Sequence, residues 1–134
     1  RVESYNDNLL LGSDVSTAEN NFDSRHPLYQ TLKRLTLVRR AHPALMGGEQ
    51  SVIYAEEAAG ILALRRQSKG KSDAVLVVFN SSLSPATASL KLANDLKDMC
   101  FIDGEAGELE KAENALIYTA PALSWAVYSL IDCK

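Results

Sequence analysis

From residue 50 to the C-terminus, short apolar segments alternate with turns, and this pattern constrains the fold more than any other feature. The run 74–79 is apolar at every position, so we expect a central strand that is covered on both faces. The segment 86–92 instead alternates apolar with polar residues, which is typical of a half-exposed strand. Short strands separated by turns predict a mainly β fold, an antiparallel Greek-key-like β-sandwich.

The individual strands can be placed from the same alternation. We expect turns or loops at 69–73, 81–85 and 103–107, and the stretch 108–114 is left open between helix and loop. The last apolar segment starts at Pro121, with Leu123, Trp125, Val127 and Ile131 on one face. The other predicted strands are 51–55, 61–66, 74–79, 86–92, 99–102 and 115–119.

Ahead of the sandwich, residues 25–45 have the pattern of one long helix that follows a polar loop at 1–24. Asp23 and Ser24 can accept hydrogen bonds from the first free amides of the helix, and Pro43 stops it. We expect His26 to contribute to the N-terminal end of this helix and His42 to contribute to its C-terminal end. The apolar face is formed by Leu28, Leu32, Leu35 and Val38.

Two residues do not fit a helix with a single neighbour. Arg39 falls inside the apolar arc, and Leu37 falls on the opposite, polar side. A helix held between two bodies would explain both, with the Arg39 stem buried and its tip on a carboxylate or carbonyl. The alternative is an Arg39 that extends its tip to solvent and a single exposed Leu37.

Composition excludes some classes of function. The net charge is -3, and the chain lacks the basic patch that a nucleic-acid partner requires. No apolar run approaches the roughly 20 residues of a membrane span, so no membrane partner is expected. Cys100 and Cys133 are expected to be reduced, half-buried thiols, and a single bridge that ties down the C-terminus is the alternative. No histidine accompanies them at metal-ligand spacing, so no metal or cofactor is predicted.

The N-terminal residue is Arg1, and no signal peptide opens the chain. We therefore expect a piece of a longer protein with any targeting segment upstream. This leaves its location open, and a secreted or periplasmic parent is one expectation.

Few residues are candidates for chemistry. Glycoside hydrolysis needs two carboxyl groups on either side of a sugar, and nothing ranks one loop acid, such as Asp7 or Asp14, above another. The acids from Asp103 to Glu113 are expected to be a solvated surface stretch. Aromatic rings can stack on sugars, and the candidate residues for substrate binding are Tyr54, Tyr118 and Tyr128. Trp125 is expected in the core, and Tyr128, on the opposite face, is expected to be exposed.

Two segments carry a resemblance to a known family: NFDSRHPLYQ at 21–30 and LVRRAHPAL at 37–45. They resemble the eighth barrel helix, and the approach to it, of the α-amylase family, glycoside hydrolase family 13. The later segments ILALRR at 61–66, VLVVFNSS at 75–82 and LSWAVY at 123–128 resemble strands of that family's C-terminal β-sandwich. The match covers most of the chain.

The resemblance implies that residues 1–46 are the end of a (β/α)8 barrel and that 47–134 are the C-terminal domain. The family's catalytic carboxylates lie upstream, so the fragment is expected to be no enzyme, while its parent is a retaining α-glucan hydrolase. Asp7, Asp14 or Asn21 would line the outer substrate cleft. The expected function is a non-catalytic domain that packs on and stabilises the missing barrel.

Two other functions stay open. The sandwich could be a carbohydrate-binding module that contacts α-glucan through surface tyrosines, or the chain could be a stand-alone interaction domain. Without its barrel the apolar helix face would be exposed, so self-association of the fragment is expected.

Overall fold

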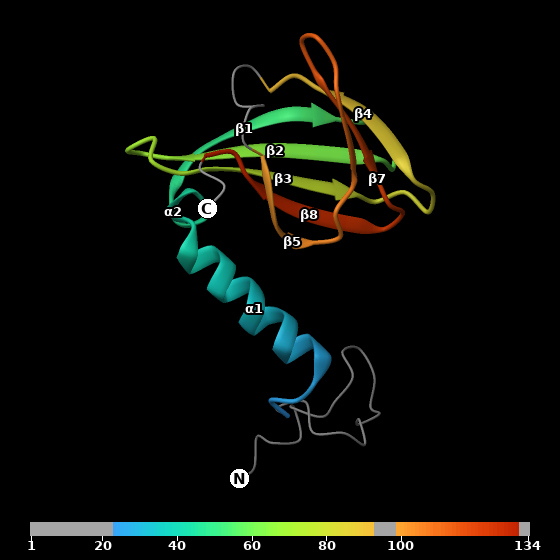
Figure 1. Cartoon of the computed structure of the whole chain (residues 1–134). Coiled ribbons are helices and arrows are strands. Elements are labelled where there is room, and N and C mark those ends of the chain that lie inside the picture. Colours follow the sequence, from blue (N-terminus) through green and yellow to red (C-terminus); the bar gives the residue numbers. More distant parts are fainter. Residues whose placement is uncertain (1–22, 93–98, 132–134) are drawn as a thin grey trace. The chain divides into compact units, whose positions relative to one another are not determined.

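The computed structural model describes residues 23–92 and 99–131 (Figure 1). The chain divides into two compact units between Leu37 and Val38, and each is described by itself. The first unit contains most of α1 (Pro27–Ala41), and the second contains the β-sandwich. Neither described helix is long and apolar enough to cross a bilayer.

Side chains of the preceding segment organise the start of α1. The backbone N–H of Leu28 donates to Nδ1 of His26 at 3.2 Å, so the expected role of His26 at the helix start is confirmed. The Asp23 carboxylate accepts bonds from the backbone N–H and the guanidinium of Arg25, at 2.9 and 3.2 Å. These hydrogen bonds hold the pKa of Asp23 below its usual value.

The predicted single helix over 25–45 is interrupted at His42. α1 ends at Ala41, and the short helix α2 (Pro43–Met46) follows it directly. His42 has φ −118° and ψ 98°, an extended conformation. Proline disfavours the helical conformation in the residue before it, and it fits the first position of a new helix. Pro43 therefore stops one helix, as predicted, but it also starts another.

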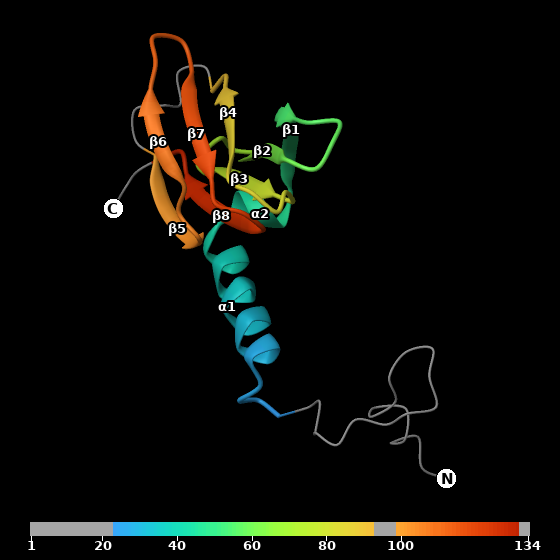
Figure 2. The same cartoon turned by 90° about the vertical axis from the view of Figure 1, so that its right-hand side faces the viewer.

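Two antiparallel sheets form the second unit (Figure 2). The five-stranded sheet has the order β1-β2-β3-β8-β5, and the three-stranded sheet has the order β4-β7-β6. The central position of β3 in the larger sheet and the mainly β, antiparallel fold with one long helix are both as predicted. The strands are β1 (Gly48–Ala55), β2 (Ile61–Ser68), β3 (Ala74–Asn80), β4 (Ala86–Leu90), β5 (Cys100–Gly104), β6 (Glu108–Lys111), β7 (Leu116–Ala120) and β8 (Ser124–Ser129).

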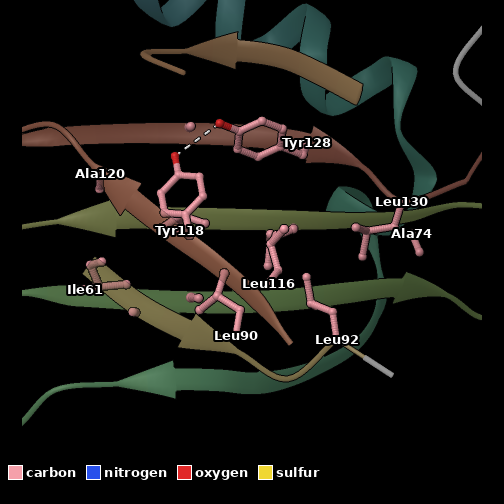
Figure 3. Packing of buried hydrophobic residues seen from close by; sticks show 14 residues of the cluster. Ile61, Ala74, Leu90, Leu92, Leu116, Tyr118, Ala120, Tyr128 and Leu130 are labelled. Carbon is pink, nitrogen blue, oxygen red and sulfur yellow. Dashed lines mark hydrogen bonds between the residues drawn. The ribbon is translucent and has the colours of Figure 1, made fainter. Parts of the chain in front are cut away.

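The main hydrophobic core fills the space between the two sheets (Figure 3). Leu76 on β3 and Leu90 on β4 are fully buried, and Tyr118 and Tyr128 are at most 2% exposed. The alternation predicted for 86–92 is confirmed, because Ala88, Leu90 and Leu92 are buried and the residues between them are exposed. The other members are Ile61, Ala63, Ala74, Val78, Leu116, Ala120, Ala126 and Leu130.

The predictions for the stretch 108–114 and for Cys100 are wrong. The stretch 108–114, expected to be helix or loop, begins with the edge strand β6, whose four residues are all exposed. Its pairing with β7 determines its conformation, and a fully exposed strand has no apolar alternation to reveal it. Cys100 is disulfide-bonded, so a reduced thiol was the wrong expectation there. Cys133 lies outside the described residues.

A buried asparagine at the end of β3 joins two loops. Asn80 is 3% exposed, and its side-chain amide donates to the carbonyl oxygens of Ser84 at 3.0 Å and Pro121 at 2.8 Å. Its side-chain oxygen accepts the N–H of Ser82 at 2.9 Å. Because β3 and β4 belong to different sheets, Asn80 fixes the chain where it crosses from one sheet to the other.

We predict that Asn80→Ala lowers the free energy of unfolding by about 2–3 kcal/mol, because buried groups lose their hydrogen-bond partners. Urea denaturation followed by tryptophan fluorescence measures the change. Ser89→Ala, at an exposed position of β4, is the control and should stay within about 0.5 kcal/mol. Equal stability of the two variants would contradict the role assigned to Asn80.

Candidate functional site

The three tyrosines predicted to bind sugar do not share a surface. Tyr118 and Tyr128 lie in the core, 1% and 2% exposed, so the prediction that Tyr128 is exposed is wrong. Both faces of β8 carry apolar residues, and the face with Tyr128 is the one that packs on the second sheet. Tyr54 on β1 is partly exposed, and its hydroxyl donates to the Glu56 carboxylate at 3.2 Å.

The two buried tyrosines form a hydrogen-bonded pair. Their hydroxyl oxygens lie 3.2 Å apart, and the rings meet edge to face at 5.9 Å between centroids (Figure 3). The Tyr128 hydroxyl also accepts the N–H of Gly107 at 3.0 Å. Burial, followed by the bond to Tyr128, raises the pKa of Tyr118 above its ordinary value. These rings therefore join the β5–β6 connection to the core and present no free face to a sugar.

A second apolar surface covers the face of the five-stranded sheet that turns away from the main core. Leu62, Phe79 and Trp125 are direct neighbours across β2, β3 and β8. They alternate with core residues along their strands, so they point to the opposite face, which we call the outer face. Leu62 is 37% exposed and Phe79 is 42% exposed. Trp125 is half-buried beside Val75 and Val127 in a small cluster of its own.

Helix α2 covers one part of this outer face and is fixed there by charged side chains. Its residue Ala44 is fully buried against Val75 and Val127. The Asp73 carboxylate, which comes from the β2–β3 turn, accepts the Ala44 N–H at 3.0 Å and lies 3.3 Å from Nδ1 of His42. Arg66 donates from Nε to the Ala44 carbonyl oxygen at 2.9 Å. We call His42, Asp73 and Arg66 the α2 anchor.

The α2 anchor was not found from the sequence. His42 stands at the N-cap position of α2, but its side chain makes no capping hydrogen bond. Asp73 caps the helix instead, because its carboxylate accepts the N–H of Ala44, which lies 29 residues earlier in the chain. Asp73 was assigned only to a turn, and Arg66 only to a strand. A carboxylate directly before the apolar run of β3 is a weak signal, and only the fold shows which helix it caps.

The long helix α1 has no buried residue in the described part of the chain. Leu28 is 61% exposed, Leu32 is 57% exposed and Leu37 on the opposite side is 58% exposed. Arg39 is exposed as well. The expectation that a helix with apolar residues on two sides is held between two bodies stays a prediction.

The candidates with polar or acidic side chains separate into two groups. Asp7, Asp14 and Asn21, the predicted lining of a substrate cleft, lie outside the described residues. In the stretch that was expected to be solvated, Glu105, Glu108, Glu110 and Glu113 are exposed, whereas Asp103 is half-buried. Within the described ranges, no group of three or more histidines, cysteines or carboxylates could hold a metal ion.

The sequence of this chain is similar to those of known proteins. An α-amylase from Streptomyces lividans is 35% identical over 89 residues, which are 66% of this chain and 10% of that protein. The chain is part of an α-amylase-family protein. The predicted resemblance is thereby confirmed. This chain spans about a tenth of the length of that curated relative. No model of a protein family matches the chain.

Solved structures agree with the fold. A debranching enzyme from Nostoc punctiforme superimposes with a TM-score of 0.61 and 24% identity, over 75% of this chain and 21% of that one. A protein named AmyP, crystallised with maltose, gives a TM-score of 0.63 and 19% identity, over 88% of this chain and 23% of that one. At these identities the likeness establishes the fold alone.

The α2 anchor makes a clear prediction. Asp73→Ala removes the cap of α2 and leaves the buried Ala44 N–H without its acceptor, so we expect a loss of about 1–3 kcal/mol. Asp73→Asn keeps a side-chain oxygen and should recover part of that loss. Thermal and urea unfolding of both variants test this, and a loss in Asp73→Ala below about 0.5 kcal/mol would show that the cap contributes nothing.

The tyrosine pair predicts how stability depends on alkaline pH. The pKa of Tyr118 is raised in the folded state, so its hydroxyl keeps the proton at a pH where an unfolded tyrosine, with its ordinary pKa of 10.0, already ionises. The stabilising effect is therefore fully present below about pH 10 and is lost as the pH rises further. Tyr118→Phe should cost about 1 kcal/mol at pH 7 and should flatten this alkaline decline.

Urea unfolding between pH 7 and pH 11 measures the effect. Tyr29→Phe, on an exposed ring of α1, is the matched control at pH 7 and should change stability by less than about 0.5 kcal/mol. An alkaline decline that is equally steep with and without the Tyr118 hydroxyl would contradict the assignment.

Proposed function

We propose that this chain is the non-catalytic C-terminal domain of an α-amylase-like glycoside hydrolase that acts on α-glucans. Its role is to pack on the catalytic barrel of the same polypeptide and to stabilise it. The observation that carries the proposal is the outer face of the five-stranded sheet, where Leu62 and Phe79 are exposed beside Trp125. A sheet face of this composition normally lies against another layer of protein.

The physical argument concerns both faces of one sheet. The second sheet covers the main core, and α2 covers only the part of the outer face around Ala44. Large apolar side chains on the remaining part gain free energy when a partner removes them from water. α1 adds further exposed leucines in the segment that resembles the last barrel helix. The names of the relatives supply the activity proposed for the parent enzyme.

A second candidate function is a carbohydrate-binding module that uses surface tyrosines. The burial of Tyr118 and Tyr128 removes two of its three rings from contact with a ligand. Tyr54 remains, with a partly exposed ring and a carboxylate at its hydroxyl, so the candidate rests on this residue. Titration with maltoheptaose, comparing the chain with its Tyr54→Ala variant, tests it.

Two substitutions test the structural role because they match in exposure. Phe79 on the outer face is 42% exposed, and Leu109 on the other sheet is 43% exposed. In the parent enzyme we expect Phe79→Lys to lower the melting temperature by several degrees, because the substitution places a charge in an apolar interface. Leu109→Lys should leave it unchanged, and kcat at low temperature should be similar in both variants.

The 134-residue chain gives an independent readout. We expect it to self-associate through its exposed apolar faces, and Phe79→Lys to reduce this association in light scattering. Equal melting temperatures for both variants of the parent would contradict the proposed role. Hydrolysis of starch by the 134-residue chain itself would contradict its non-catalytic nature.

A further inference from the structure

A row of polar side chains crosses the outer surface of the three-stranded sheet. Thr87 on β4 pairs in register with Thr119 on β7, and Thr119 pairs in register with Glu108 on β6. The two threonine hydroxyl oxygens lie 2.9 Å apart. Among the described residues, no hydrogen bond or ion pair engages the exposed Glu108 carboxylate. The row thus offers two hydroxyls and a carboxylate along one line.

The polar row ends in a hollow of about 240 Å³. Thr119 and Glu108 belong both to the row and to the lining of the hollow. The rest of its lining is small and apolar: Pro85, Ala106, Ala120 and Pro121. Pockets for drug-sized ligands are usually larger, roughly 300–1,000 Å³, so this hollow suits one small ring.

Hydrogen bonds from Asn80 and to Tyr128 hold the backbone beside the hollow. The buried Asn80 amide binds the carbonyl oxygen of Ser84, directly before Pro85, and that of Pro121. One side chain therefore fixes both proline walls. On the remaining side, Gly107 follows Ala106, and its N–H is bound by the Tyr128 hydroxyl of the tyrosine pair. A preformed site loses little conformational entropy when a ligand binds.

The lining selects the chemical class of the ligand. The Glu108 carboxylate disfavours anions, and a single carboxylate is too few ligands for a metal ion. A purely apolar ligand would cover the carboxylate and the hydroxyls without hydrogen-bonding to them. A pyranose ring fits both parts, because its hydroxyls can donate to the carboxylate and bond to threonine while its C–H face contacts the prolines and alanines.

We infer that the hollow bounded by Pro85, Glu108, Thr119 and Pro121 is a binding site for one sugar ring of a neutral saccharide. Glu108 accepts hydrogen bonds from two adjacent sugar hydroxyls, and the Thr119 hydroxyl bonds to a third. This site is separate from Tyr54 and needs no aromatic platform. It stands on its own geometry and does not depend on the proposed role of the domain in stabilising a barrel.

The test is an NMR titration of the ¹⁵N-labelled 134-residue chain with maltotriose and, separately, with methyl α-glucoside. A ligand that places one small ring in a preformed hollow is expected to bind with a dissociation constant of about 1–10 mM. Saturable shifts should centre on the amides of residues 106–108 and 119–120. Shifts centred on Tyr54 instead, or no saturable shift at 50 mM of either sugar, would overturn the assignment.

Two conservative variants and one control sharpen the result. Glu108→Gln keeps the shape but removes the charge that strengthens the hydrogen bonds, and Thr119→Val keeps the shape but removes the hydroxyl. Each should weaken binding about 3–10-fold. Glu110→Gln, at the next outward position of β6 and outside the hollow, should leave the affinity unchanged. Equal weakening by Glu108→Gln and Glu110→Gln would indicate a general effect of negative charge and would overturn the proposal.

Discussion

The structure depends on one constraint: β3 is apolar on both of its faces, and a sheet with such a strand at its centre needs two covers. The second sheet provides one cover through the core around Leu76 and Tyr128. The other cover is partial, because α2 buries Ala44 against Val75 and leaves Phe79 exposed. The division of the molecule into a closed interior and an open apolar surface follows from this single strand.

Polar groups decide how the covers are attached. Asp73 and Asn80 stand at opposite ends of β3, one just before it and the other at its last position. Asp73 holds α2 on the outer face, and Asn80 holds the two loops that lead into and out of the second sheet. Each side chain satisfies backbone groups that burial would otherwise leave without partners. β3, whose two apolar faces both need to be buried, thus has at its ends the residues that hold the covering elements in place, Asp73 and Asn80.

The sequence predicted the architecture well and the surfaces poorly, for physical reasons. Apolar segments located seven of the eight strands in the described part of the chain, and β6 was missed because all four of its residues are exposed. Apolar alternation also could not orient β8, where Trp125 and Tyr128 lie on opposite faces that are both apolar. The site residues were harder still. Asp73, Asn80 and the row of Thr87, Thr119 and Glu108 act through partners far away in the sequence, and local patterns carry no information about such pairs.

The attachment of α2 also has a consequence for protein engineering. The turn between β2 and β3 is exposed at Lys69 to Ser72 and would be a natural place to graft an epitope or to open the chain for circular permutation. The residue that closes this turn is Asp73, whose carboxylate holds the first turn of α2. An insertion that shifts Asp73 would detach a helix more than 25 residues upstream. Exposure alone is therefore a poor guide to where this domain tolerates change.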